Sequence, residues 1–264
     1  MNDDTLVVGI IPARTASTRL PQKLLLPLQG KPILHHTYQR ARQAKTLKQL
    51  FIAAGDQEIE NSAQKIGAPV ITVFDSDITC GSERVWRASV RLFDGVDISK
   101  LEPLIVNIQA DQPLLDPETI DLLVEKAVKT VSPAVVTPIA PIVSEEEFLD
   151  PAVVKVAIDR NHRALYFSRA PIPYRINKSP TTDTLWQNAP LGFRHIGIYA
   201  FWWRALRDFS CAIPTPLEQM ESLEQLRLLE IGIPVWIVVV PSAPQEVNTP
   251  DDYQSLIACM GDLK

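Results

Sequence analysis

The chain has 264 residues, of which 46% are hydrophobic and 22% are charged, and its formal net charge is −5. This composition is typical of a soluble globular protein that can bury a substantial core. The negative balance leaves no broad basic surface for a polyanion, so we expect no nucleic-acid partner. Cations that gather locally in this chain are therefore expected to serve a small anion.

The cysteines and the apolar segments indicate the cellular environment. Cys80, Cys211 and Cys259 are scattered and form no CxxC pair, which is typical of reduced thiols in the cytosol. The first residues lack a cationic signal-peptide pattern, and no apolar stretch reaches the roughly 18 residues of a membrane span. We expect a cytoplasmic protein with no membrane partner.

Short apolar runs alternate with helical patterns along the chain. The run at 6–11 is rich in β-branched residues, and the runs at 50–54, 69–74 and 103–108 resemble it. Runs that are apolar on both faces are typical of strands covered by helices on either side. This pattern predicts an α/β fold with a mostly parallel, doubly wound sheet.

Three helices are indicated by the residues at their ends. The helix expected at 116–131 begins with Asp116 as a cap and Pro117 in the first turn. The helix expected at 215–232 begins with a capping box and ends on a glycine. The helix expected at 249–260 begins with a capping box of the same kind.

The middle of the chain has a different pattern. From about 134 to 203 strands dominate, and residues 171–191 are rich in Pro, Asn and Thr, as in a long loop. We expect a mixed-sheet insertion or subdomain that covers one edge of the parallel sheet. No repeat or clean linker divides the chain, so residues 1–264 are expected to form a single domain.

The loop after the first predicted strand carries three cations, Arg14, Arg19 and Lys23, with Ser17 and Thr18 among them. Ligands of open parallel sheets bind beyond the carboxyl ends of the strands. Arginine grips phosphate oxygens with a planar fork, lysine adds a mobile charge, and backbone N–H groups can complete an anion nest. Neither GxxxxGK[ST] nor GxGxxG occurs. A phosphate site and a solvated surface loop are about equally compatible with this loop alone.

A carboxylate follows another predicted strand. The run at 103–108 leads to Gln109 and Asp111, at the same edge of the sheet as the cationic loop. Mg²⁺ prefers one or two carboxylates together with substrate phosphates. By itself Asp111 could be a loop cap before Pro113. Together, the loop and this carboxylate predict a site for a metal–nucleotide complex.

Nine separated segments, in order, carry a family resemblance. They are IPARTASTRLPQK (11–23), GKPILHHTYQRA (30–41), CGSERV (80–85), VNIQADQP (106–113), VKVAID (154–159), ALYFSRAPIP (164–173), RHIGIYAF (194–201), PLEQMESLEQLRLLEIG (216–232) and EVNTPDDY (246–253). Over about residues 7–257 the chain resembles the 3-deoxy-manno-octulosonate cytidylyltransferases, or CMP-KDO synthetases.

The resemblance implies a nucleotide-diphospho-sugar transferase fold of Rossmann-like type, usually in a homodimer. It implies that CTP and 3-deoxy-D-manno-octulosonate (KDO) give CMP-KDO and pyrophosphate, with Mg²⁺, for lipopolysaccharide or related polysaccharide synthesis. The anomeric hydroxyl of the sugar acid would attack the α-phosphorus in line with the departing pyrophosphate. No side chain is assigned as general base.

The resemblance also implies residue roles on the nucleotide side. Lys23, Arg14 and Asp111 would be catalytic, and Asp111 would bind Mg²⁺ with Asn248 in the late motif. Gly81 and Ser82 would bring the backbone close to cytosine. The other positions implied to contact the CTP phosphates or nucleotide are Ser17, Arg19 and Arg84.

A second group of positions matches those that line the sugar-acid site in the family: Gln109, Arg169, His195, Tyr199, Glu224 and Gln225. Each has a structural alternative. Arg169 could be an ion-pair partner, and His195 could be a satisfied core histidine. Tyr199 could be a core residue, and Glu224 and Gln225 could be solvated residues on the surface of a helix.

This chain departs from the family's usual pattern near the metal. Asn248 stands where an Asp is usual, and Gln112 replaces a usual Glu, so negative charge is lost. Gln22 replaces a usual Gly, which matters little unless that backbone needs a positive φ. Three accounts stay open, namely an active enzyme with a weaker metal requirement, an enzyme for another keto sugar acid such as 8-amino-KDO or a nonulosonate, and a catalytically weak nucleotide- or sugar-binding relative.

Overall fold

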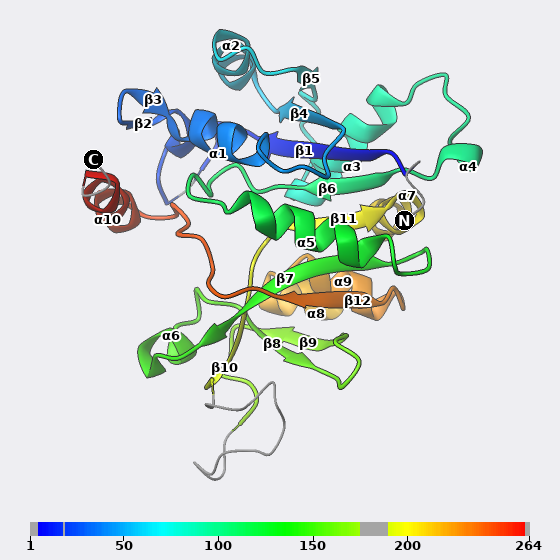
Figure 1. Cartoon of the computed structure of the whole chain (residues 1–264), viewed down its shortest axis with the longest axis vertical. Helices are drawn as coiled ribbons and strands as arrows, with labels where there is room; N and C mark the ends of the chain where they lie inside the picture. The colour runs from blue at the N-terminus through cyan, green and yellow to red at the C-terminus, as the bar shows by residue number, and fades with distance from the viewer. Residues whose placement is uncertain (1–4, 18, 175–189, 262–264) are drawn as a thin grey trace.

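A computed structural model describes residues 5–17, 19–174 and 190–261 of the chain (Figure 1). Thr18 and most of the predicted loop at 171–191 lie outside the described residues. The described strands form one ten-stranded sheet and one two-stranded hairpin. In spatial order the large sheet has β5 (Val70–Thr72), β4 (Gln49–Ala54), β1 (Val7–Ala13), β6 (Leu104–Asn107), β11 (Tyr199–Trp202), β7 (Val135–Ile142), β10 (Gly192–His195), β8 (Lys155–Ile158) and β9 (Ala164–Ser168), with β12 (Val235–Val239) beside β7.

The sheet combines a parallel part with an antiparallel part. Strands β5, β4, β1 and β6 run parallel to one another, and β12 runs parallel to β7. Strand β11 is antiparallel to both β6 and β7, and β10, β8 and β9 continue with antiparallel pairs. The predicted α/β class with a mostly parallel central sheet is confirmed. The division of the chain into domains stays a prediction.

Helices cover both faces of the sheet, because the side chains of its inner strands alternate between two cores. Val7 and Ile11 of β1 belong to a cluster with α1 (Ile33–Ala41), α2 (Gln57–Lys65) and α5 (Pro117–Ala127). Val8 and Ile10 belong to another cluster with α3 (Gly81–Leu92), α7 (Trp203–Cys211) and α9 (Gln225–Glu230).

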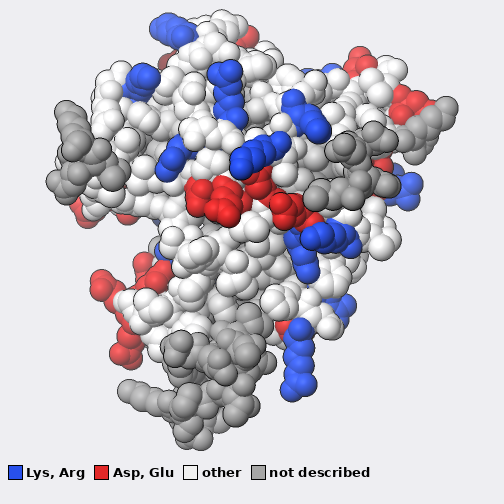
Figure 2. Space-filling view, in the orientation of Figure 1, with Lys and Arg blue, Asp and Glu red and all other residues white. Residues whose placement is uncertain are grey.

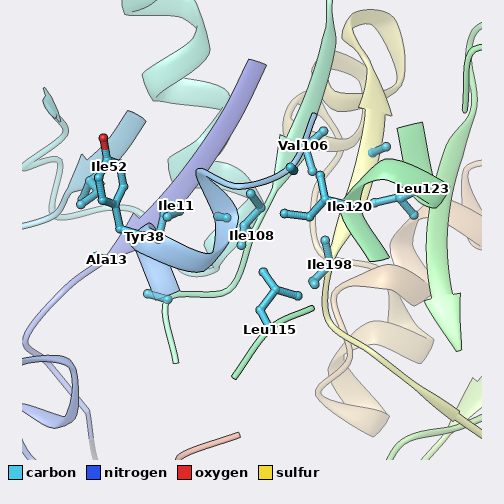
Figure 3. Packing of buried hydrophobic residues seen from close by; sticks show 14 of the residues in the cluster. Ile11, Ala13, Tyr38, Ile52, Val106, Ile108, Leu115, Ile120, Leu123 and Ile198 are labelled. Carbon is cyan, nitrogen blue, oxygen red and sulfur yellow. The ribbon is translucent and has the colours of Figure 1, made fainter. Parts of the chain in front are cut away.

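Figure 3 shows part of the first cluster, where Ile120 and Leu123 of α5 lie close to strand residues such as Val106. All three side chains are fully buried. Burying one side chain of this size contributes about 1.5–3 kcal/mol. Buried side chains on both faces hold β1 and β6 firmly beside each other.

All three predicted helix starts are confirmed. The backbone N–H of Thr215 donates to Glu218 (3.1 Å) at the start of α8 (Pro216–Glu221). Asp116 accepts a hydrogen bond from the backbone N–H of Glu118 (3.1 Å), and Pro117 is the first residue of α5. At α10 (Pro250–Gly261), Asp252 accepts from the backbone N–H of Thr249 (2.7 Å), and the hydroxyl of Thr249 accepts from the N–H of Asp252 (3.2 Å). These bonds satisfy backbone donors that the first helical turn leaves free.

The prediction that one unbroken helix runs from 215 to 232 is wrong, although its start is correct. The chain forms α8 (Pro216–Glu221), turns at Ser222 with φ 53°, and continues as α9. The guanidinium of Arg169 donates to the carbonyls of Glu221 (2.8 Å) and Ser222 (3.4 Å). The groups that would continue the helix are therefore bound by a side chain from beyond β9.

The carboxyl-terminal helix packs on the small hairpin of β2 (Pro27–Leu28) and β3 (Lys31–Pro32), as Figure 1 shows. Tyr253 Oη donates to the carbonyl of Pro27 (2.5 Å). Leu28, Val247 and Leu256 are buried together in a third cluster. This cluster anchors the segment before α10 next to η1 (Lys23–Leu25).

The remaining described helices are α4 (Ile98–Leu101) and α6 (Glu145–Leu149).

On the face shown in Figure 2, Lys and Arg side chains lie interspersed with Asp and Glu. Within the described ranges, no helix is both long and apolar enough to cross a membrane.

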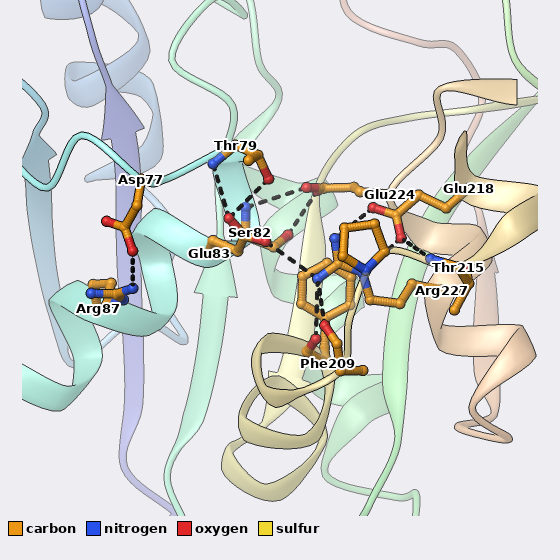
Figure 4. A network of polar contacts seen from close by, with 12 residues as sticks. Asp77, Thr79, Ser82, Glu83, Arg87, Phe209, Thr215, Glu218, Glu224 and Arg227 are labelled. Carbon is orange, nitrogen blue, oxygen red and sulfur yellow. Dashed lines mark hydrogen bonds and ion pairs between the residues drawn. The ribbon is translucent and has the colours of Figure 1, made fainter. Parts of the chain in front are cut away.

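A buried ion pair joins α8 to α9. Arg227 Nε and Nη2 donate to the two carboxylate oxygens of Glu218 (2.7 and 2.5 Å), and Nη1 reaches Glu83 of α3 (3.3 Å), as Figure 4 shows. The carbonyls of Phe209 and Ala212 accept from the same Nη1 (3.2 and 3.3 Å). This cation is only 1% exposed.

We predict that Arg227→Met lowers the free energy of unfolding by about 3–5 kcal/mol, because it leaves the Glu218 carboxylate without its buried partner. The measurement is equilibrium unfolding in urea. The control is Arg207→Met, which removes an exposed partner of Asp208 and should cost about 0–1 kcal/mol. Equal losses for both variants would contradict the role of the buried pair.

Candidate active site

A pocket of about 710 Å³ opens at the carboxyl ends of β1 and β6. It contains the residues directly after both strands, so the predicted shared crevice of the cationic loop and Asp111 is confirmed. Helix α3 contributes a third wall. The lining residues are Pro12, Ala13, Arg14, Ala16, Ser17, Arg19, Lys23, Leu24, Cys80, Gly81, Arg84, Gln109, Ala110 and Asp111.

The first part of the cationic loop is pinned by Asp56. One oxygen of this carboxylate accepts from the backbone N–H and the hydroxyl of Thr15 (2.6 and 3.0 Å), while the other caps α2 at Ile59 (2.9 Å). Arg14 and Arg19 remain exposed. Their guanidinium groups can therefore reach a ligand above a loop whose backbone is held in place.

Gln22 adopts a left-handed conformation, with φ 54° and ψ 25°. The backbone at position 22 therefore has the positive φ that a glycine adopts more easily, so the replacement of the family's usual glycine by Gln22 matters here. Such a backbone costs a non-glycine residue roughly 1–2 kcal/mol. Gln22 Nε2 donates to Glu58 (3.1 Å), and the turn delivers Lys23 into the pocket.

Lys23 joins the opening loop to the opposite side of the pocket. Its Nζ donates to Asp111 Oδ2 (2.5 Å) and to Asn248 Oδ1 (3.2 Å). The same amide oxygen accepts from Arg19 Nη2 (3.1 Å). Two cations of one loop thus meet oxygen ligands from two other segments.

Glu246 is the carboxylate that the sequence analysis missed. It accepts hydrogen bonds from Gln112 Nε2 (3.1 Å) and Asn248 Nδ2 (3.2 Å). Burial, and next the charge of Asp111, raise the pKa of the Glu246 carboxyl above its ordinary value. The available signal was its spacing, since residues two apart in an extended segment share one side.

The residues at this end fit a magnesium ion. Asp111 and the amide of Asn248 supply hard oxygen atoms, and the Lys23 ammonium already lies where a cation is stabilised. In the described ranges, no three His, Cys, Asp or Glu residues gather as a metal cage. Mg²⁺ commonly binds through one or two carboxylates plus substrate phosphates, so a full protein cage is unnecessary.

Arg84 lines the pocket with a side chain that is otherwise buried. Its Nη1 donates to the carbonyl of Val73, and it packs so tightly on Gly55 that a Cβ there would lie 2.8 Å from it. Burial, followed by repulsion from Arg14, lowers its pKa. The two arginines therefore form a compact positive region at the end of β1.

The start of α3 links the pocket to α9. Ser82 donates through its hydroxyl to Glu224 Oε1 (2.7 Å), as Figure 4 shows, and accepts from Asn107 Nδ2 (3.1 Å). Gly81 lines the pocket, and an added Cβ would meet protein atoms only at 3.7 Å or more. Burial, and then Glu224, raise the pKa of the Cys80 thiol.

His195 and Tyr199 form a buried group that does not line the pocket. His195 Nε2 hydrogen-bonds with the hydroxyl of Thr137 (2.9 Å), and its ring lies 5.3 Å from that of Tyr199. Tyr199 Oη donates to Gln225 Oε1 (3.3 Å). Burial lowers the pKa of His195 to about 3, so the ring is neutral at physiological pH. These are the contacts of a satisfied core histidine, and ligand binding by this group stays a prediction.

Arg169 lies apart from the pocket-lining residues. Besides its bonds to α8, its Nη1 donates to the carbonyl of Pro151 (2.9 Å), and its backbone N–H donates to Glu221 Oε2 (2.9 Å). Every contact described for this guanidinium is structural. Its pairing with a substrate carboxylate stays a prediction.

The helix break explains how Glu224 and Gln225 come to face inward. Both follow the turn at Ser222, and they point to Ser82 and Tyr199 respectively. The alternative that both residues are solvated is therefore wrong. Gln225 is only 4% exposed, and Glu224 is hydrogen-bonded to α3. Their ligands stay predictions.

Comparison with known proteins gives one consistent family. A family model described as Cytidylyltransferase matches residues 8–236. The 3-deoxy-manno-octulosonate cytidylyltransferase of Chloroherpeton thalassium is 36% identical over 255 residues, covering 96% of this chain and 97% of the relative. That of Chlorobium phaeobacteroides is 38% identical over 250 residues, covering 94% of each chain.

A solved structure gives the same result in three dimensions. The CMP:2-keto-3-deoxy-manno-octonic acid synthetase in complex with CTP superposes with a TM-score of 0.85 at 31% identity. The match covers 98% of this chain and 100% of that one. A cytidylyltransferase from Leptospira borgpetersenii, at 17% identity and a TM-score of 0.57, shares the fold.

We predict that acid destabilises the protein through His195. The unfolded histidine binds a proton below its ordinary pKa of about 6.5, whereas the buried ring does so only near pH 3, so stability falls as the pH drops between these values. His195→Gln should remove roughly 1.5 kcal/mol of the loss between pH 6.5 and 5, measured by urea unfolding at both pH values. An unchanged acid loss in this variant would contradict the buried neutral ring.

Proposed function

The chain belongs to the family of 3-deoxy-manno-octulosonate cytidylyltransferases, and we propose that it joins CTP to KDO, releasing CMP-KDO and pyrophosphate. It is accordingly a nucleotidyltransferase. The observation that carries this proposal is the pocket in which Arg14, Arg19 and Lys23 stand opposite Asp111. Cations that bind a triphosphate and a carboxylate that binds a metal are the two parts that such a transfer needs.

The cations of the opening loop hold the triphosphate in the proposed reaction. Arg14 and Arg19 are exposed at the pocket rim, and Lys23 projects from the turn at Gln22. Their charge stabilises the negative charge that grows on the leaving pyrophosphate. Ser17 and neighbouring backbone N–H groups add hydrogen-bond donors.

The sugar acid supplies the nucleophile. Its anomeric hydroxyl forms a bond to the α-phosphorus while the bond from that phosphorus to the bridging oxygen of pyrophosphate breaks, and the hydroxyl proton leaves to solvent. Gln109 lines the pocket, and we propose that it orients the sugar there. By the family resemblance, Tyr199 and its hydrogen-bond partner Gln225 would complete the sugar-acid site. Orientation of the two substrates is the main contribution of the protein.

Asp111 and the oxygen of Asn248 are the residues that would hold Mg²⁺. When bound, this ion would neutralise phosphate charge and lower the pKa of the attacking hydroxyl.

By the family resemblance we also propose a cytoplasmic homodimer. Sedimentation of the purified chain tests the dimer directly.

A pyrophosphate-release assay tests the proposed reaction. It pairs CTP, UTP, ATP and GTP with KDO, 8-amino-KDO and a nonulosonate, with Mg²⁺ or with EDTA. We expect pyrophosphate release from CTP and KDO in the presence of Mg²⁺, and no release from this pair in EDTA. Release with another keto sugar acid but not with KDO would reassign the substrate, and saturable CTP binding without release would indicate a binding protein.

We predict that Asp111→Ala lowers CMP-KDO formation by about 10²–10³-fold or more, because it removes the chief metal carboxylate. The measurement is the steady-state rate at saturating CTP and KDO, with thermal unfolding as a check on folding. Asp77→Ala is the control, since it removes an exposed carboxylate that pairs with Arg87 outside the pocket. Wild-type activity of Asp111→Ala would remove the metal assignment.

We predict that Asn248→Asp increases turnover or lowers the Mg²⁺ concentration needed for half-maximal rate. The reason is that a second negative charge joins that of Asp111 at the position where Lys23 and Arg19 now contact the Asn248 oxygen. The measurement is a magnesium titration of the rate. A titration curve that superposes on that of the wild type would show that position 248 does not reach the metal.

A further inference from the structure

A carboxylate without a role in the proposed reaction lies beside Asp111. Glu246 belongs to the segment before α10, and Val247 next to it is fully buried in the cluster under that helix. The backbone N–H of Val247 donates to the carbonyl of Asp111 (3.1 Å). This bond ties the two segments together and holds Glu246 and Asn248, the neighbours of Val247 in the chain, close to Asp111.

The side chains around this bond form a continuous line of polar contacts. Glu246 Oε2 accepts from the amide of Asn248, whose oxygen faces the Lys23 ammonium, which in turn binds Asp111. One positive group is thus held between a carboxylate and an amide oxygen, with a second carboxylate directly behind. This is an environment built to stabilise a cation.

The carbonyl oxygen of Gln112 is an independent sign of a missing ligand. The side chain is fully buried, its Nε2 donates to Glu246 Oε1, and its Oε1 has no hydrogen-bond partner. Both atoms sit on one amide carbon, so the unpartnered oxygen belongs to the same group that contacts the Glu246 carboxylate. A buried carbonyl oxygen without a donor is costly unless a cation or its bound water satisfies it.

From these contacts we infer that Glu246 supplies the second carboxylate of the divalent-cation site, together with Asp111. The inference rests on the proposed function. Asp111 and Glu246 provide two negative charges and Asn248 provides a neutral oxygen, which is the donor set that Mg²⁺ or Mn²⁺ takes together with phosphates. The carboxylate that is usual at position 248 in the family is replaced by one two residues earlier, on the same side of an extended segment.

Glu246 could instead serve only to hold the segment, as the acceptor for Gln112 and Asn248. A neutral isostere at position 246 has different effects if Glu246 is a segment anchor and if it is a metal ligand. Glu246→Gln keeps the size and an acceptor oxygen but loses the charge. A segment anchor would tolerate it or would lose CTP and metal affinity together, whereas a metal ligand loses metal affinity selectively.

The test measures Mn²⁺ affinity by the electron paramagnetic resonance signal of free Mn²⁺, at saturating CTP and without sugar acid, so that no turnover occurs. CTP affinity in EDTA is measured in parallel by calorimetry. We expect Glu246→Gln to weaken Mn²⁺ binding by about 10-fold or more, with CTP affinity in EDTA unchanged or slightly tighter. Glu58→Gln, which removes an exposed carboxylate that contacts Gln22, is the matched control and should bind Mn²⁺ as the wild type does.

Rescue makes the test specific. The double variant Glu246→Gln with Asn248→Asp restores two carboxylates and should regain most of the lost Mn²⁺ affinity. The assignment is overturned if Glu246→Gln binds Mn²⁺ within 2-fold of the wild-type affinity. It is also overturned if this variant loses CTP affinity in EDTA by the same factor as it loses Mn²⁺ affinity. If Glu246→Gln does not fold, Glu246→Asp replaces it, and unchanged Mn²⁺ affinity of that shortened carboxylate overturns the assignment as well. Wild-type protein that binds no CTP would overturn the proposed function itself.

Discussion

The contact between Lys23 and Asp111 is the interaction on which the site depends. It joins the loop after β1 to the loop after β6, and these two strands are adjacent and parallel. The fold brings opposite charges to the same edge of the sheet, where a triphosphate and a divalent ion can each take one of them. A cationic loop alone would attract any anion, whereas cations facing a carboxylate select an anion that arrives with its own metal.

The surrounding structure keeps this pair of loops in register. Two apolar clusters clamp the sheet from both faces, Asp56 fixes the start of the cationic loop, and the cluster under α10 fixes Val247 against Asp111. After the break between α8 and α9, Glu224 bonds to Ser82 at the start of α3, and Gln225 bonds to Tyr199 of β11. Rigid elements thus position the groups that the chemistry needs.

The parts of this arrangement that depend on local patterns could be read from the sequence. Apolar runs predicted the parallel strands, caps predicted α5 and α10, and the position of Asp111 at a strand end predicted its place opposite Lys23. Features that depend on contacts between distant segments could not be read in this way. At the break between α8 and α9, Arg169 from a distant segment binds the carbonyls. Gln22 takes a left-handed conformation in the turn before η1. Glu246 comes close to Asp111 through the backbone bond from Val247 across the fold.

A crystal structure with CTP and Mn²⁺, in which anomalous scattering locates the metal, tests the central claim most directly. We predict a metal about 2.1 Å from an Asp111 oxygen and bound to the triphosphate, with Lys23 turned from Asp111 to a phosphate oxygen. A metal bound only by the triphosphate and remote from Asp111, with Lys23 and Asp111 still paired, would contradict the account.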